Sequence, residues 1–273
     1  MSIKTILVHA DPGSGCDRRV RLTAQIADLL GATVTGLGAE AFNPMLACGD
    51  TGIDGAMMEV VRARIAADLP AAEKHFAELM AGRAGARWVA AADYPDRMLA
   101  LHARCADLVV ASRPVRGQSA AFCADPVNLI LQAGGPVLLA ADGGAEFDGG
   151  HVVIGWKDTR ESRRAVADSL PFLTRAKGVA IVVVGGEAND PADQAGLRDV
   201  ARRLARHGVE AAIEVTPKGA VSVAEALEAA AARRGADLIV VGAYGHSRLR
   251  EWMLGGVTED LIAASSKFVL FSH

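Results

Sequence analysis

Short runs of β-branched and aliphatic residues alternate with alanine-rich stretches along the whole chain, and this alternation constrains the fold most. It is typical of βαβ units, which build a parallel sheet covered by helices. Strands buried on both faces read as continuous apolar runs, as these do. Five strands are predicted in each half, at residues 5–8, 33–37, 87–90, 107–111 and 136–140, then 151–154, 179–184, 211–215, 237–241 and 268–271.

The two halves also repeat one another in sequence. Residues 106–110 read ADLVV and residues 236–240 read ADLIV, while VLL in the first half recurs as VLF in the second at nearly the same offset. A Gly- and Asp-rich connector lies between the repeats. The sequence therefore predicts two tandem α/β domains, residues 1–142 and residues 150–273.

Two of the predicted helices carry distinctive local signals. Asp158, with Glu161 three residues later, suggests an N-cap and capping box for a helix that reaches about Leu173. In the first half a long helical stretch covers residues 56–80. Pro70 should kink or split it, because proline removes a backbone donor and clashes with the preceding turn.

Composition indicates a compact globular protein and argues against membranes and nucleic acids as partners. Hydrophobic residues make up 51% of the chain, and no apolar run reaches the ~20 residues that a bilayer span needs. A net charge of −3 gives no electrostatic reason to expect nucleic-acid or membrane binding. The N-terminal residues lead straight into a strand without a signal-peptide core, so a cytoplasmic location is expected. Reduced, buried or half-buried thiols are expected at Cys16, Cys48, Cys105 and Cys123.

Familiar catalytic and cofactor signatures are absent from the sequence. It holds no P-loop, no G-x-G-x-x-G dinucleotide turn and no H-E-x-x-H zinc helix. Ser119 lies in the segment GQSAA, which lacks the second glycine of a nucleophile elbow and does not directly follow a strand. The histidines show no metal-ligand spacing. We therefore expect no catalytic residue and no metal site.

One group of residues near the C-terminus points to a ligand. Residues 242–245 read GAYG directly after a strand, and nine residues later residues 255–258 read GGVT before a helical run. Loops at the carboxyl ends of parallel strands bind ligands in open α/β sheets. Unpaired N–H groups at a helix N-terminus favour an anion. A nucleotide could lie across both loops, with its ribose near Gly242 and its phosphates on Gly245, Gly255, Gly256, Val257 and Thr258. Taken alone, however, Gly242 and Gly245 could be mere turn glycines.

The pattern G-x-x-G-x(9)-G-[ST]-V-T after a strand ending in DLIV resembles the ATP-binding motif of the universal stress protein family. The resemblance covers both halves and is that of the tandem two-domain type. It implies an α/β fold like that of the adenine nucleotide alpha hydrolases, with two open parallel five-stranded sheets in the order 3-2-1-4-5, flanked by helices. Members respond to starvation, oxidative and other stresses, and they divide into nucleotide binders and non-binders. The resemblance also implies a homodimer.

The second half departs from the family pattern in two places. Gly256 replaces the usual Ser or Thr, which removes one hydroxyl donor worth ~1.5–3 kcal/mol at most. Binders carry an acidic residue after the first strand, whereas this chain has Lys157. A lysine could pair with a phosphate or lie on the purine face, but it accepts no hydrogen bond. Val184 is expected as the apolar wall for the base, and His246 could contact a phosphate or lie exposed in its loop.

The first half departs from the family pattern in the opposite way: it has the acidic residue but lacks the glycines. Asp11 suits the acidic position after its first strand, but residues 112–115 read SRPV, without either glycine. Residues 125–128 read DPVN where the second cluster would be, and proline removes a donor there. We expect this domain to be degenerate for ATP, and to be structural or to bind something else.

The sequence thus predicts a stress-response module that binds ATP, ADP or AMP, with or without Mg²⁺, in its C-terminal domain only. Any hydrolysis should be slow, because no general base or metal-binding carboxylate is evident beside the proposed phosphates. Two alternatives stay open: a scaffold without nucleotide that acts through dimer surfaces, and an ATP-hydrolysing or adenylylating enzyme. The expected partners are a nucleotide, a second copy of the chain and an unknown protein.

Overall fold

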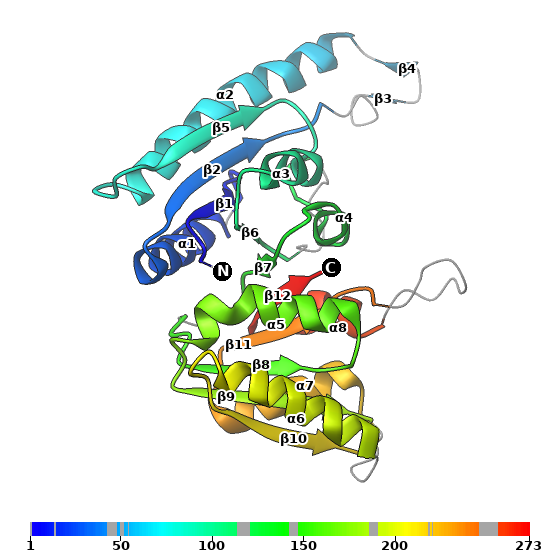
Figure 1. Ribbon diagram of the computed structural model, residues 1–273. Helices are drawn as coiled ribbons and strands as arrows, with labels where there is room; N and C mark the ends of the chain where they lie inside the picture. The colour runs from blue at the N-terminus through cyan, green and yellow to red at the C-terminus, as the bar shows by residue number, and fades with distance from the viewer. Residues whose placement is uncertain are drawn as a thin grey trace. The chain divides into compact units, whose positions relative to one another are not determined.

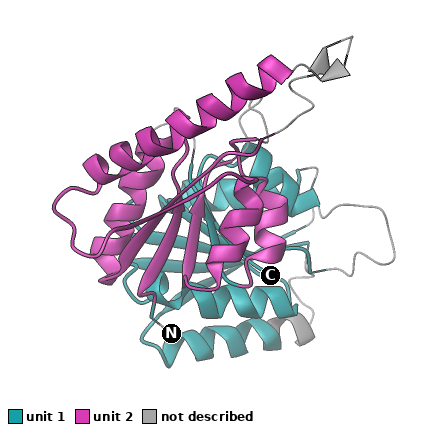
Figure 2. Ribbon diagram, turned by 90° about the horizontal axis from the view of Figure 1, so that it is seen from above, with its two compact units in different colours: residues 1–2, 135–273 teal, residues 3–134 magenta. Residues whose placement is uncertain are grey.

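A computed structural model describes residues 2–13, 15–42, 48–49, 52–53, 55–113, 121–141, 147–185, 191–217, 219, 221–245 and 256–273. The chain divides into two compact units (Figure 2). The N-terminal unit comprises residues 3–134, and the C-terminal unit comprises residues 135–273 with residues 1–2. Both units have the predicted α/β construction.

The N-terminal unit is a parallel sheet flanked by helices (Figure 1). Its sheet has the order β5-β2-β1-β6, and each neighbouring pair of known register is parallel. By position in the chain this is the predicted order for the first four strands. Its elements are β1 (Thr5–His9), α1 (Cys16–Leu30), β2 (Thr33–Ala39), the short pair β3 (Cys48–Gly49) and β4 (Gly52–Ile53), α2 (Gly55–Leu79), β5 (Arg87–Ala91), α3 (Pro95–Ala103), β6 (Leu108–Ala111) and α4 (Pro126–Gln132).

Two glycines in β2 allow aromatic rings to approach the backbone of the strand closely. A Cβ atom on Gly36 would lie 2.7 Å from the ring of Phe76 in α2. One on Gly38 would lie 2.6 Å from the ring of Trp88 in β5. The two rings contact each other with their centroids 5.4 Å apart. A side chain at Gly36 would therefore displace Phe76 of α2, and one at Gly38 would displace Trp88 of β5.

Two local expectations need correction in this unit. Pro70 does not split α2, because apolar residues on both sides of the proline are buried in the unit and hold one helix together, while a kink at Pro70 stays a prediction. Among the described cysteines, Cys16 is buried and Cys123 half-buried, but Cys105 is exposed. It follows α3 in a turn, where little chain covers it.

In the C-terminal unit, the parallel strands have the order β10-β9-β8-β11-β12. This is the predicted order 3-2-1-4-5. The elements of the unit are β7 (Val137–Leu139), β8 (His151–Gly155), α5 (Arg160–Leu173), β9 (Gly178–Val184), α6 (Pro191–Ala205), β10 (Ala211–Thr216), α7 (Val223–Arg234), β11 (Leu238–Gly242), α8 (Gly256–Ala264) and β12 (Phe268–Ser272).

Strand β7 forms where residues 136–140 were predicted as the fifth strand of the first half. It groups with the C-terminal unit and pairs antiparallel with β12, Leu138 opposite Leu270. This pairing satisfies backbone groups that an open edge would leave unpaired. An apolar run predicts a strand but not its partner. The domain limits proposed from the repeats, 1–142 and 150–273, remain a prediction.

Helices α5 and α7 cover opposite faces of the C-terminal sheet. A Cβ on Gly155 would meet Leu227 of α7, whereas one on Gly242 would meet the backbone of α5. Gly155 pairs with Val241, the residue before Gly242, and successive residues of a strand face opposite sides. The amino end of α5 therefore reaches the sheet where β11 ends.

Within the described ranges, no helix combines the length and the apolar character that a membrane span requires. The same residues bring together no group of three or more His, Cys, Asp or Glu side chains able to hold a metal ion.

Candidate functional site

The glycine-rich turn proposed from the sequence follows β11 at the carboxyl edge of the C-terminal sheet. Gly242 is the last residue of β11. The amide of Ala243 donates to the carbonyl of Ser272 at 2.8 Å, which ties the turn to the end of β12. Tyr244 has a φ of 55°, in the left-handed region that non-glycine residues seldom adopt. The backbone therefore turns sharply away from the sheet just before Gly245.

The first residues of α5 pack directly against this turn. A Cβ on Gly242 would lie 2.5 Å from the carbonyl carbon of Glu161 and from the amide nitrogen of Ser162. A Cβ on Gly245 would lie 2.7 Å from Oε2 of Glu161 and 3.2 Å from Oγ1 of Thr159. Gly242 thus allows one backbone to approach another, while Gly245 lies beside a side-chain carboxylate.

Thr159, not Asp158, caps α5. Thr159 has the extended conformation of an N-cap residue, and its Oγ1 accepts a hydrogen bond from the amide of Ser162 at 3.3 Å. Asp158 lies one residue too early for this bond and instead pairs with Arg163 at 2.6 Å. The sequence contained two adjacent residues able to cap, and the backbone angles select the second.

Glu161 places a negative charge beside the glycine-rich turn. Its side chain is 7% exposed, and its Oε1 accepts from Nε of Arg160 at 3.0 Å. Burial, the largest influence, favours the neutral carboxyl group, but hydrogen bonds from its own amide, Thr159 and Arg160 outweigh it and lower the pKa of Glu161. The group is therefore ionised at neutral pH.

The second predicted cluster opens α8. Gly256 is exposed and is the first residue of the helix, Val257 is half-buried, and Thr258 is buried. Helix α8 leads into β12, which runs parallel to β11. The N-terminus of α8 therefore lies at the same edge of the sheet as the turn after β11. The first amides of a helix have no partner within the helix.

Four more residues were predicted for the site. Lys157 is exposed and follows β8, two residues before the cap of α5. Val184 is half-buried and ends β9. His246 and Gly255 lie outside the described residues. Lys157 and Val184 thus end or follow strands at the same edge as the glycine-rich turn.

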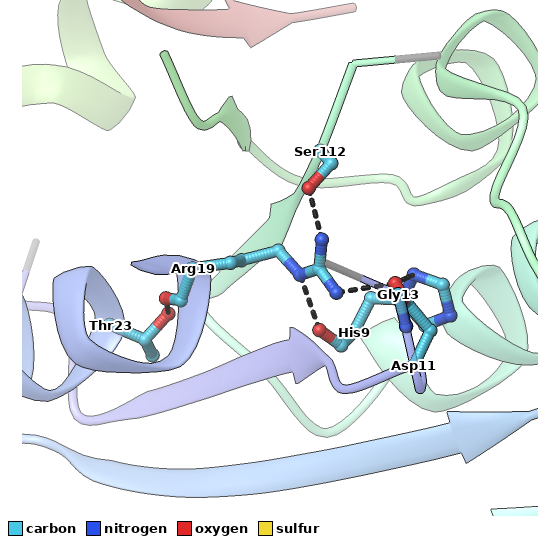
Figure 3. Close-up of polar contacts among 6 residues, drawn as sticks. All are labelled: His9, Asp11, Gly13, Arg19, Thr23 and Ser112. Atoms are coloured by element: carbon cyan, nitrogen blue, oxygen red, sulfur yellow. Dashed lines mark hydrogen bonds and ion pairs between the residues drawn. The ribbon is translucent and has the colours of Figure 1, made fainter. Parts of the chain in front are cut away.

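In the N-terminal unit, the corresponding edge contains a buried arginine (Figure 3). Arg19 extends from α1 and is 1% exposed. Its Nε donates to the carbonyl of His9 and its Nη2 to Oδ2 of Asp11, both at 2.5 Å. Its Nη1 donates to the hydroxyl of Ser112. The guanidinium group therefore bridges the carboxyl ends of β1 and β6.

Asp11, which the sequence suggested for a ligand, is bonded within this cluster. Its Oδ1 accepts from the amide of Gly13 at 2.6 Å. Burial acts to raise the pKa of Asp11, but the charge of Arg19, followed by His9 and the Gly13 hydrogen bond, outweighs it and lowers the pKa. Two of the acceptor positions of this carboxylate are occupied by the protein itself.

His9 is buried and neutral in the same cluster. Burial, reinforced by the charge of Arg19 and opposed by Asp11, lowers the pKa of His9 to about 4. Its Nδ1 lies 3.3 Å from Oδ2 of Asp11, while its Nε2 has no hydrogen-bond partner among the described residues. Nδ1 therefore carries the proton.

Residues 151–273 match the model of the universal stress protein family. These residues are a universal stress protein domain. A universal stress protein from Archaeoglobus fulgidus is 14% identical, with a TM-score of 0.71 over 98% of this chain and 95% of its own. A putative universal stress protein from Pseudomonas aeruginosa is 18% identical, with a TM-score of 0.65 over 99% of this chain and 93% of its own. The whole chain thus shares the fold of these proteins. No curated protein matches it.

Sequence reasoning missed the buried Arg19, and it took Glu161 for a capping residue only; Arg19, however, left a signal. Arg19 lies in the apolar stripe of α1, in line with Thr23, Ile26 and Leu30. A charge inside such a stripe indicates a buried partner. Glu161 in the universal stress protein domain left no such signal, because a glutamate in a first helical turn reads equally well as part of a cap.

The neutral state of His9 makes stability depend on pH. Its pKa is about 4 in the folded chain against 6.5 when unfolded. Between these values the unfolded chain binds more protons, so stability falls as the pH is lowered from about 6.5 to about 4, by up to about 3 kcal/mol. Urea titrations across this range measure the loss.

The matched variant for this prediction is His9→Asn, whose amide can replace the Nδ1 donor but does not titrate. Its stability should change much less between these two pH values than that of the wild type. Below pH 4, both proteins should lose stability as Asp11 becomes protonated. Parallel curves for the two proteins above pH 4 would contradict the assignment to His9.

Proposed function

We propose that the universal stress protein domain binds an adenine nucleotide, ATP, ADP or AMP, without strong catalytic activity, and that the chain is a stress-response module. One observation carries the proposal. The glycine-rich turn after β11 and the first turn of α8 open at the same carboxyl edge of a parallel sheet. Ligands of open α/β sheets bind at such edges.

The backbone around α8 supports an anionic ligand. Among the described residues, nothing lies within 4 Å of a Cβ on Gly256, so none of them fills the space beside the first residue of the helix. The first amides of the helix and the positive end of its dipole favour a phosphate there. Because Gly256 replaces a hydroxyl residue, the donors that remain are backbone amides and the hydroxyl of Thr258.

Calorimetric titration with Mg-ATP and with AMP tests the proposal. We expect Gly245→Val to abolish binding, because its side chain would fill the turn beside Glu161. Thr258→Ala should weaken binding about tenfold or more, the usual cost of losing a hydrogen bond to a charged group. The matched control is Gly196→Val in α6, where a Cβ would meet nothing within 4 Å. Equal affinity in all four proteins would mean that any ligand binds elsewhere.

A scaffold that binds no nucleotide is the second candidate, and Glu161 is the observation that favours it. Its buried carboxylate lies beside Gly245 and opposes a polyphosphate there. If the wild type shows no heat of binding with any adenine nucleotide at millimolar concentration, the scaffold becomes the better account. Sedimentation of the full chain would then measure the self-association on which a scaffold with dimer surfaces depends.

A further inference from the structure

Each unit has a buried charged side chain at the carboxyl edge of its sheet, supplied by the first helix of the unit. In the N-terminal unit this is Arg19 of α1, and in the C-terminal unit it is Glu161 of α5. Arg19 is neutralised by the buried carboxylate of Asp11. Glu161 is bonded to Arg160, whose side chain is 78% exposed. At the N-terminal edge the buried charge is therefore paired with a buried counter-charge, whereas at the C-terminal edge the counter-charge is exposed to solvent.

The two carboxylate oxygens of Glu161 have different surroundings. Oε1 accepts from Arg160. Oε2 lies toward the glycine-rich turn, 2.7 Å from the point where a Cβ on Gly245 would lie. In the proposed binding mode the amide of Gly245 donates to a phosphate. A phosphate on that amide would therefore lie close to a carboxylate oxygen.

Water screens the charges of this ion pair unequally. Glu161 is 7% exposed and Arg160 is 78% exposed. An exposed charge is weakened by solvent, whereas a covered one acts over several ångströms at an effective dielectric constant of about 20. A ligand on the turn would therefore experience mainly the negative charge. Repulsion grows with each phosphate group, and it is absent for an uncharged nucleoside.

We propose that the carboxylate of Glu161 restricts the C-terminal site to adenine nucleosides and nucleoside monophosphates in preference to the triphosphate. This inference rests on the proposed function and names the ligand class of the same site. In this account the first backbone amides of α8 hold one phosphate. Glu161 opposes a longer chain of phosphates along the glycine-rich turn after β11.

Glu161 could instead accept a hydrogen bond from a ribose hydroxyl. That role predicts the opposite result for an uncharged ligand, because losing an acceptor weakens the binding of adenosine. The size of the ligand charge thus separates the two roles, and adenosine, AMP, ADP and ATP form the appropriate series.

The experiment is calorimetry of this series with the full-length wild type and with Glu161→Gln, in EDTA to remove divalent cations. The control is Asp158→Asn, which makes the same change in net charge at a carboxylate that is 60% exposed. We expect the wild type to bind ATP no more tightly than AMP. In Glu161→Gln, ATP affinity should rise about tenfold or more while adenosine affinity changes less than threefold. Asp158→Asn should behave as the wild type. Added Mg²⁺ should reduce the difference between wild type and Glu161→Gln for ATP.

Each other outcome contradicts a specific part of this account. Unchanged ATP affinity in Glu161→Gln, or a parallel change for adenosine and ATP, overturns the role of Glu161 but leaves nucleotide binding intact. A tenfold rise in Asp158→Asn as well would reduce the effect to net charge and overturn it too. If no protein binds any of the four ligands while thermal melts show that all are folded, the proposed function fails and the inference fails with it.

Discussion

Replacement of Arg19 by methionine is expected to lower the free energy of unfolding by about 3–5 kcal/mol. The change leaves the carboxylate of Asp11, which is 10% exposed, without its cation. It also removes the donors to the carbonyl of His9 and the hydroxyl of Ser112. A buried charge that loses its partner cannot recover the solvation it gave up on folding. Urea denaturation measures the loss, and hydrogen exchange should report it in peptides from residues 3–134.

A second variant isolates the cause of this loss. Arg19→Met combined with Asp11→Asn removes both charges and should recover most of the stability, because the amide can still accept from Gly13. Arg83→Met serves as the surface control, since Arg83 pairs with Asp28 at side chains that are 35% and 59% exposed. That change should cost less than about 1 kcal/mol. If Arg19→Met cost no more than Arg83→Met, the buried pair would not be a major source of stability.

Gly242→Ala should have the second largest effect, a loss of about 2–3 kcal/mol with loss of nucleotide binding. The added methyl group would lie 2.5 Å from backbone atoms of Glu161 and Ser162, so the start of α5 must move. Backbone cannot rotate away as the end of a side chain can. Thermal unfolding and calorimetric titration on the same sample measure both effects.

Two other glycines of the motif provide graded controls. The methyl group of Gly245→Ala would contact Oε2 of Glu161, at the end of a flexible side chain, whereas that of Gly256→Ala would contact no described residue within 4 Å. The loss of stability should therefore decrease from Gly242→Ala to Gly245→Ala to Gly256→Ala, and the last should lie within about 0.5 kcal/mol of the wild type. A different order would mean that the contact between the turn and α5 is looser than described.

The sequence pattern predicted most of the helices and strands, and the resemblance to the universal stress protein family implied the order of the parallel strands. Residues 238–241 are all buried, as a continuous apolar run in a parallel sheet should be. The same reasoning predicted β7 as a strand but not its antiparallel pairing with β12, because Val137–Leu139 is apolar whichever strand it pairs with. It also chose Asp158 over Thr159 as a cap, since both side chains carry a suitable oxygen.

Periodicity and spacing were thus enough to determine the alternating strands and helices, the duplication and the glycine-rich turn after β11, because these depend on residues close together in the chain. Only the tertiary structure decided which charge lies at each sheet edge. Arg19 meets Ser112 across 93 residues, and Glu161 meets Gly245 from the other end of its domain. Whether a charge is buried, paired or turned toward a ligand depends on packing between distant segments, which no local pattern encodes.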